Sequence, residues 1–297
     1  PLVSEIAKSV KDPQTKISVF ERINAVNATN GKEPASKLMA INNHQLKLGA
    51  LGSGSDYSTF IQHLGIPALN MGYGGEDRGG EYHTNYDSYS NFIRFKDPGF
   101  YYEKALAETA GRTVLRISEA DILPFRYSHL TATIIEYKNQ LLSLINEKRA
   151  NVTAENKLID VHAYKNAWDP KENFNLPISK EMVPFLDFSP LENVLQRLQF
   201  ITDKLQSTYA QNIKNNTTDT GLNTKLYRAE QRLLGNGLPM RPWYRHVIYA
   251  PGYYTGYGVK TMPGIREAIE ENDFLEAQKQ IQVAAEVLKQ FADYLEK

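Results

Sequence analysis

The 297-residue sequence contains no cysteine. This absence excludes disulfide frameworks, thiolate zinc sites and cysteine nucleophiles, so a bound metal would have to be held by histidine, aspartate or glutamate. No apolar run approaches the roughly 20 residues that a membrane-spanning helix needs, and the N-terminal residues lack the apolar core of a signal peptide. Neither sign of charge is in excess, because Lys plus Arg and Asp plus Glu each number 34, so nucleic acid is not an expected partner.

The chain length favours two domains, since a domain typically has about 150 residues. Residues 1–125 are expected to form an α/β domain, with buried strands at 46–52 and 66–72 and a short helix between them. A further helix, predicted over residues 98–117, closes this domain.

Residues 126–297 carry long amphipathic helices and are expected to form an antiparallel helical bundle. The clearest apolar stripe follows the helix-start signal Ser189-Pro190 and recurs at helical spacing. Its members are Leu191, Val194, Leu195, Leu198, Ile201, Leu205 and Tyr209. The loop 235–263 is rich in glycine, proline and tyrosine, which is typical of a packed lobe or a pocket wall.

Two loops carry candidate functional residues. Residues 53–56 follow a predicted strand and open a predicted helix, so their backbone amides can point at a substrate carboxylate or peptide oxygen. The alternative is that Ser55 or Asp56 only caps that helix. His83, in the run GGEYHTNYDSY, is a candidate metal ligand, and a plain surface-loop histidine is the competing interpretation.

Other polar residues are given no catalytic role. His246 and His129 lie beside aromatic and arginine residues and are expected to make structural packing contacts. His63 has no carboxylate or histidine at metal-ligand spacing. The run GSGSD does not meet the G-x-S-x-G pattern of a serine nucleophile, so serine hydrolase chemistry is not expected.

Six short motifs occur in order along the chain: LGSGSDYSTFIQHLGIP, EYHTNYDSY, KDPGF, LPF, RPWYRHVIYAP and MPGI. Over nearly the whole chain, they resemble the glutamate carboxypeptidase and transferrin-receptor family. The resemblance implies that residues 1–125 are the C-terminal part of a zinc-peptidase α/β domain, a mixed sheet with flanking helices. It also implies that residues 126–297 are a transferrin-receptor-like dimerisation domain whose loop 235–263 returns toward the active site.

In that family two zinc ions share a bridging carboxylate. By the resemblance, His83 falls on the last zinc ligand and Tyr82 on the tyrosine that helps to stabilise the tetrahedral intermediate. The other histidine, the bridging aspartate and the general-base glutamate are expected upstream of Pro1. A single imidazole cannot hold a hydrolytic zinc ion, so the isolated chain is expected to be inactive and not to retain the two ions.

The same resemblance implies a set of substrate-binding residues. Ser53 and Gly54 fall on the substrate-binding wall, and Ser55 falls on a chloride- and substrate-contacting asparagine of the glutamate-specific enzymes. Tyr257 falls on the tyrosine of a lysine–tyrosine pair in the pocket. A peptide is therefore the expected substrate.

The expected pocket departs from that of the glutamate-specific enzymes. Two arginines that grip glutamate fall on Asn70 and Gly72, and the pocket lysine falls on Gly256. None of these residues can form a bidentate fork to a carboxylate. Lys260 and Arg78 are the remaining candidates for a positive charge. The sequence thus favours a less acidic terminal residue, or an aminopeptidase-like preference.

The expected function is that of a co-catalytic zinc exopeptidase, with the upstream part of the same protein and a second copy of the helical domain as partners. A non-catalytic receptor-like dimerisation module of the same family is the alternative, against which the retained pair Tyr82-His83 argues. The N-x-S/T sequons fit a secreted or periplasmic protein, or the extracellular or lumenal part of a membrane-anchored one. They lie at Asn27, Asn151, Asn215 and Asn216.

Overall fold

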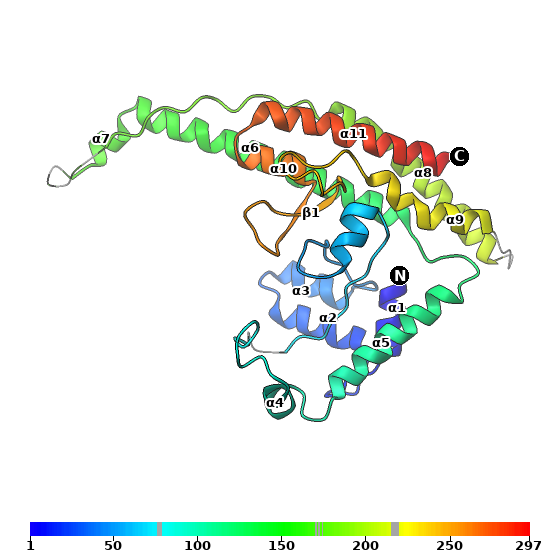
Figure 1. The fold of residues 1–297 in the computed structure, drawn as a ribbon. Helices are drawn as coiled ribbons and strands as arrows, with labels where there is room; N and C mark the ends of the chain where they lie inside the picture. Colours follow the sequence, from blue (N-terminus) through cyan, green and yellow to red (C-terminus); the bar gives the residue numbers. More distant parts are fainter. Residues whose placement is uncertain (76–78, 170, 172, 174, 215–219) are drawn as a thin grey trace. The chain divides into compact units, whose positions relative to one another are not determined.

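The computed structural model describes residues 1–75, 79–169, 171, 173, 175–214 and 220–297 of the chain (Figure 1). These residues divide into two compact units. The N-terminal unit comprises Pro1–Gly49 and Leu69–Pro124, and the helical unit comprises Ala50–Ala68 and Phe125–Lys297. The structure therefore groups residues 50–68 with the helices that follow residue 124, and the domain limits given above remain a prediction.

The N-terminal unit is built from short helices around a small apolar core. They are α1 (Leu2–Ser9), α2 (Val19–Asn30), α3 (Pro34–Ile41), α4 (Tyr89–Asn91), η2 (Phe92–Lys96) and α5 (Tyr101–Ser118). The core that α1, α2 and α5 share consists of Ile6, Ala7, Val10, Val19, Phe20 and Ala105. The Asp97 carboxylate accepts hydrogen bonds from the backbone N–H groups of Tyr101 and Tyr102, at 2.9 and 2.8 Å, and so fixes the start of α5. The helix predicted over 98–117 is thereby confirmed.

The strands predicted at 46–52 and 66–72 are wrong, because both segments lack regular secondary structure here. A strand is stable only when its backbone N–H and C=O groups pair with neighbouring strands. In the part of the chain that the structure describes, the paired strands are β1 (Tyr249–Pro251) and β2 (Val259–Thr261), which bond to each other. The mixed sheet of a zinc-peptidase domain thus stays a prediction.

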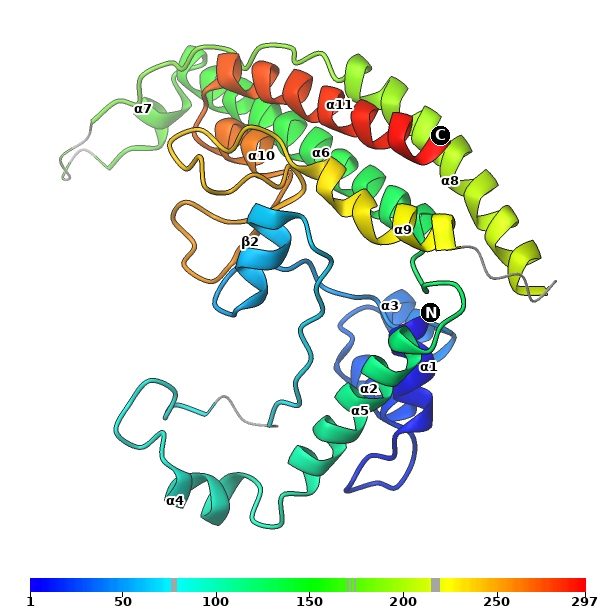
Figure 2. The same ribbon diagram turned by 45° about the vertical axis from the view of Figure 1, so that its right-hand side comes forward.

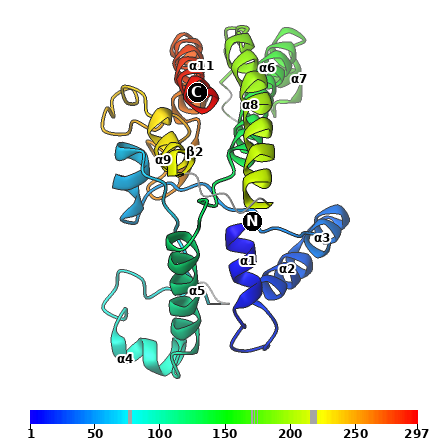
Figure 3. The ribbon, with the colours of Figure 1, turned by 90° about the vertical axis from the view of Figure 1, so that its right-hand side faces the viewer.

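The helical unit contains the long helices. Its elements are η1 (Thr59–Leu64), α6 (Tyr127–Asp160), α7 (Ala163–Ala167), α8 (Ser189–Lys214), α9 (Thr220–Arg228), η3 (Ala229–Leu233), α10 (Pro263–Glu270) and α11 (Phe274–Glu296). Helix α8 packs against both α6 and α11 (Figure 2 and Figure 3). The apolar stripe predicted on α8 faces this core, since Leu191 and Leu198 are 0% exposed. The predicted helical bundle is confirmed.

Side-chain pairs give the direction of each helix in the bundle. Lys138 pairs with Glu192 at 3.1 Å, and the Thr202 hydroxyl lies 3.4 Å from that of Thr131, so α6 and α8 are antiparallel as predicted. The side-chain pairs between α8 and α11 show the opposite relative direction.

The Gln278 side chain bonds the backbone of Asp187, and Arg197 pairs with Asp293 at 2.6 Å. Residue numbers therefore increase in the same direction along both segments, so α8 and α11 are parallel. The prediction of an antiparallel bundle is correct for α6 and α8 and wrong for α8 and α11. The reason is that α9, η3 and the loop 235–263 carry the chain back before α11 begins. Among the described residues, no helix is both long enough and apolar enough to span a membrane.

The loop 235–263 folds into a lobe that contains the β1–β2 hairpin. The two strands are antiparallel, with Tyr249 opposite Thr261 and Pro251 opposite Val259. The short helix predicted over residues 56–64 appears as η1, a π-helical turn that ends at Gly65 in the left-handed conformation, with φ of 65°. These two elements, distant in sequence, meet within the helical unit.

Candidate functional site

Residues 50–68 dock on the loop 235–263 through a buried glutamine. Gln62 is 0% exposed, and its side-chain Nε2 donates to the backbone carbonyls of Leu51, at 3.2 Å, and Gly52. Its own backbone carbonyl accepts hydrogen bonds from the N–H groups of Arg245, at 2.9 Å, and His246, at 3.1 Å. One residue, through its side chain and its backbone carbonyl, thus connects the loop before η1 with the distant lobe.

A second contact comes from His63, to which the sequence assigned no role. Its ring stacks on that of Trp243, with centroids 4.8 Å apart, and its Nδ1 donates to the Trp243 carbonyl at 2.8 Å. This is a packing role rather than a metal-binding one. These roles of Gln62 and His63 were not predicted from the sequence, where the available signal was a polar pair within the otherwise apolar run TFIQHL.

Three of the predicted substrate-binding residues come together at this docking site. The Ser53 hydroxyl donates to the Gly256 carbonyl at 3.2 Å. Gly54 has φ of +88°, and a Cβ atom built there would lie 2.6 Å from Cδ1 of Tyr257. Glycine is therefore required at this position both by the backbone conformation and by the closeness of the ring. We call Ser53, Gly54 and Tyr257 the wall.

Ser55 lies beside the wall and is exposed. Its backbone carbonyl accepts from the Ser58 N–H at 3.1 Å, and no side-chain bond caps η1, so the alternative in which Ser55 or Asp56 caps that helix is not realised. Tyr257 is 62% exposed and presents its ring to solvent. The wall therefore combines a hydroxyl group, a glycine backbone that lies close to Tyr257, and an exposed aromatic ring.

Cations near the wall are neutralised by α10. Lys260 pairs with Glu270 at 2.7 Å, and Arg241 pairs with Glu267 and donates to the Pro251 carbonyl at 2.7 Å. Lys260 is therefore not directed at the wall as a carboxylate ligand. Arg78, the other cation considered, lies outside the described residues.

His246 is buried, as its packing role requires, whereas His129 is exposed and the packing predicted for it is wrong. The His246 Nε2 lies 3.0 Å from the Glu230 carboxylate, and the ring stacks on Tyr249 at 5.2 Å. Burial raises the pKa of the Tyr249 hydroxyl, and the nearby Tyr137 and Glu230 raise it further, so Tyr249 stays protonated.

The remaining predicted site residues belong to the N-terminal unit. Asn70 is exposed there. His83 is exposed, adopts φ of 61°, and its ring stacks on that of Tyr82 with centroids 3.8 Å apart. Tyr82 is itself 63% exposed. Their roles in catalysis and metal binding stay predictions.

The described residues do not form a zinc site by themselves. They contain no group of three or more His, Cys, Asp or Glu side chains that could hold a metal ion. A hydrolytic zinc ion needs at least three protein ligands or ligands shared between two ions, and His83 supplies a single nitrogen.

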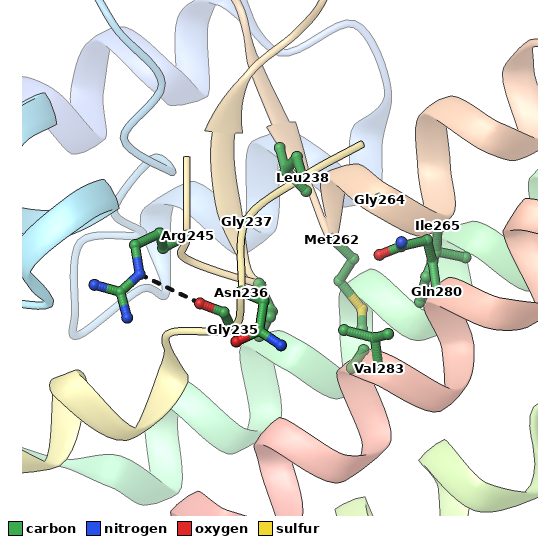
Figure 4. Close-up of a pocket in the computed structure, with 12 residues that line it drawn as sticks. Gly235, Asn236, Gly237, Leu238, Arg245, Met262, Gly264, Ile265, Gln280 and Val283 are labelled. Atoms are coloured by element: carbon green, nitrogen blue, oxygen red, sulfur yellow. Dashed lines mark hydrogen bonds between the residues drawn. The ribbon is translucent and has the colours of Figure 1, made fainter. Parts of the chain in front are cut away.

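A small pocket lies behind the lobe, between residues 235–247, α10 and α11 (Figure 4). Its cavity has a volume of about 20 Å³, which accommodates about one water molecule. Arg245 closes one side through a hydrogen bond from its Nε to the Gly235 carbonyl at 3.3 Å. Because a peptide cannot enter such a space, this pocket is not a substrate site.

Comparison with known proteins adds to this geometry. Residues 186–296 match a family model described as the transferrin receptor-like dimerisation domain. The chain is 31% identical to the probable glutamate carboxypeptidase LAMP1 of Arabidopsis thaliana, over 74% of this chain and 27% of that protein. It is 31% identical to a probable glutamate carboxypeptidase of Arthroderma benhamiae, over 82% of this chain and 30% of that protein.

A further similar protein is aminopeptidase NAALADL1 of Rattus norvegicus, which is 26% identical over 90% of this chain and 32% of its own length. The chain therefore spans about a third or less of the length of these curated relatives.

Proposed function

Because the chain belongs to the transferrin receptor-like peptidase family, we propose that it is the C-terminal portion of a di-zinc exopeptidase that hydrolyses small peptides. The observation that carries this proposal is the wall. Ser53 and Gly54 meet Tyr257 across more than 200 intervening residues, where the family resemblance expects substrate contacts.

We propose separate roles for the two units. The helical unit supplies the wall, which orients the peptide. The N-terminal unit supplies His83 as one zinc ligand and Tyr82 as a hydroxyl for the tetrahedral intermediate. The other ligands are contributed by the upstream part of the same protein, so the chain by itself is inactive.

The neutral wall favours a peptide whose terminal residue is not acidic. Lys260 is held by Glu270, and Gly256 carries no charge next to Tyr257. A glutamate side chain would therefore find no cation on the described part of this wall. Relatives named as carboxypeptidases and as an aminopeptidase support either end of the peptide as the point of attack.

We further propose that two copies pair through the helical unit, in a secreted, periplasmic or lumenal setting. The match of residues 186–296 to a dimerisation domain supports the pairing. The sequon residues Asn27 and Asn151 are exposed, as glycosylation requires, while Asn215 and Asn216 lie outside the described residues. Light scattering on the complete protein at micromolar concentration tests the pairing, and a monomer mass would count against it.

A receptor-like module without catalysis is the second candidate, favoured by the match to a transferrin receptor-like domain and by the lone His83. Zinc content and peptidase activity of the complete protein separate the two candidates. We expect His83→Ala to lose zinc and activity, and the exposed His44→Ala to retain both. Full activity and zinc content in the His83 variant would refute the role of His83 as a zinc ligand, and a zinc-free, inactive wild-type protein would favour the receptor-like candidate.

A further inference from the structure

One buried residue, His246, bonds to both segments that carry the wall, the one that bears Ser53-Gly54 and the one that bears Tyr257. The His246 backbone N–H donates to the Gln62 carbonyl at 3.1 Å, and Gln62 in turn holds the carbonyls of Leu51 and Gly52, directly before Ser53. The His246 ring acts on the other half, because its Nδ1 accepts hydrogen bonds at the start of the hairpin that carries Tyr257.

These ring contacts also fix the tautomer of His246. Nδ1 accepts from the N–H of Ile248 at 3.2 Å and from that of Tyr249 at 3.3 Å, so it carries no proton. The proton is therefore on Nε2, which donates to Glu230 of η3 at 3.0 Å. The ring is aligned between a fixed carboxylate and the first residue of β1.

The backbone around His246 is held from its other side as well. The Gly235 N–H donates to the Arg245 carbonyl at 2.8 Å, and the Val247 N–H donates to the Leu233 carbonyl at 3.0 Å. His246 is 0% exposed and Glu230 is 7% exposed. A well-packed apolar pair would avoid the desolvation cost of burying these polar groups. What the polar pair adds is a fixed orientation of the ring and of the backbone that it bonds.

We propose that His246 and Glu230 are a positioning pair that sets the spacing between Ser53-Gly54 and Tyr257. Both side chains are buried, so they act through the backbone and do not touch the substrate. That this spacing serves a peptide rests on the proposed function. The tolerance is small, because a single Cβ at Gly54 would already lie 2.6 Å from the Tyr257 ring.

Two substitutions in the complete protein separate the two ring nitrogens. In His246→Asn the amide oxygen takes the place of Nδ1 and keeps the acceptor for Ile248 and Tyr249. In His246→Gln the amide nitrogen reaches toward Glu230, but the two backbone N–H groups lose their acceptor. Because His246→Gln leaves two buried donors unpaired, it should raise KM about tenfold and leave kcat within about twofold of wild type. In His246→Asn, KM should rise less.

Two substitutions of Glu230, one conservative and one apolar, test the other end of the pair. Glu230→Gln keeps an oxygen acceptor for Nε2 and should stay near wild type, whereas Glu230→Leu removes the partner of Nε2 and should resemble His246→Asn. A merely structural loss lowers kcat with the folded fraction and leaves KM unchanged, which would overturn the proposal. The matched control is His162→Asn, at an exposed histidine whose φ of 54° asparagine tolerates.

Amide hydrogen exchange gives a readout that needs no catalysis. In His246→Gln, exchange should quicken in residues 50–56 and 252–258, while α8 and α11 keep their protection. Unchanged exchange in both segments would overturn the positioning role, whether or not the protein is a peptidase. An inactive wild type together with quickened exchange would instead refute the proposed function and leave the positioning role supported.

Discussion

At Gly52, a single added methyl group should push Ser53-Gly54 and Tyr257, the two parts of the wall, away from each other. This glycine is buried, and a Cβ atom built there lies 2.8 Å from the backbone N of Val259 and 2.9 Å from its Cα. Both are backbone atoms of β2, so no side-chain rotation relieves the overlap. In Gly52→Ala the loop or the hairpin has to move.

The size of the effect follows from these distances. Carbon atoms are in favourable contact at about 3.5–4.0 Å, so a gap of 2.8–2.9 Å has to widen by several tenths of an ångström or more. Overpacking of this kind typically costs about 1–3 kcal/mol. If that cost falls on docking, residues 50–68 undock about 5 to 150 times more often, since about 1.4 kcal/mol corresponds to a factor of ten.

Amide exchange of Arg245 and His246 measures this directly, because both N–H groups donate to the Gln62 carbonyl. We expect their exchange to quicken by that factor and KM for a peptide to rise in parallel. Gly49→Ala is the matched control, as a Cβ there meets nothing within 4 Å. Wild-type exchange in Gly52→Ala would refute the docking argument, and equal changes in both variants would show that the cause is not the contact with Val259.

Three further outcomes are expected. Phe291→Ala, at a side chain 0% exposed, should lower the free energy of unfolding by about 3–5 kcal/mol in urea titrations, and Leu275→Ala, at one 88% exposed, by less than about 0.5 kcal/mol. The hydrogen bond from Arg197 lowers the pKa of Asp293, so this ion pair stabilises the fold above the ordinary carboxyl pKa and ceases to do so as the pH falls through the lowered pKa. The difference in melting temperature between wild type and Asp293→Asn should therefore shrink in acid. Tyr257→Ala should raise KM for a peptide more than Tyr257→Phe, and equal effects would show that the ring face is not what binds.

The helices of this chain can be predicted from its sequence because each one repeats apolar residues at helical spacing. The stripe from Leu191 to Leu198 follows a start signal, and both residues are fully buried. The strands at 46–52 and 66–72 were predicted from apolar runs alone, and such runs do not show whether partner strands exist. The parallel course of α8 and α11 depends on how the intervening lobe returns, which local periodicity does not encode.

The place of Tyr257 in the wall, beside Ser53 and Gly54, was predicted only through a family resemblance. No spacing rule connects Ser53 with Gly256, since contacts between residues 203 positions apart leave no periodic signature. The buried Gln62, which joins residues 50–68 to the loop 235–263, is only one polar residue in an apolar run of the sequence. For His83, sequence and structure both give a lone imidazole, so its role depends on residues that the described chain does not bring to it.

The charge of the wall is set from outside it, by a helix of the dimerisation domain. Helix α10 presents Glu267 and Glu270 on its face toward the lobe, and these carboxylates take up Arg241 and Lys260. Without them, two cations next to the hairpin would be free to attract an acidic peptide. Glu267 also accepts from the Tyr253 N–H at 2.6 Å, so the same residue that removes the charge shapes the turn that bears Tyr257. In the proposed peptidase, the helical unit therefore sets the charge that a peptide meets at the wall, in addition to the proposed pairing of two subunits.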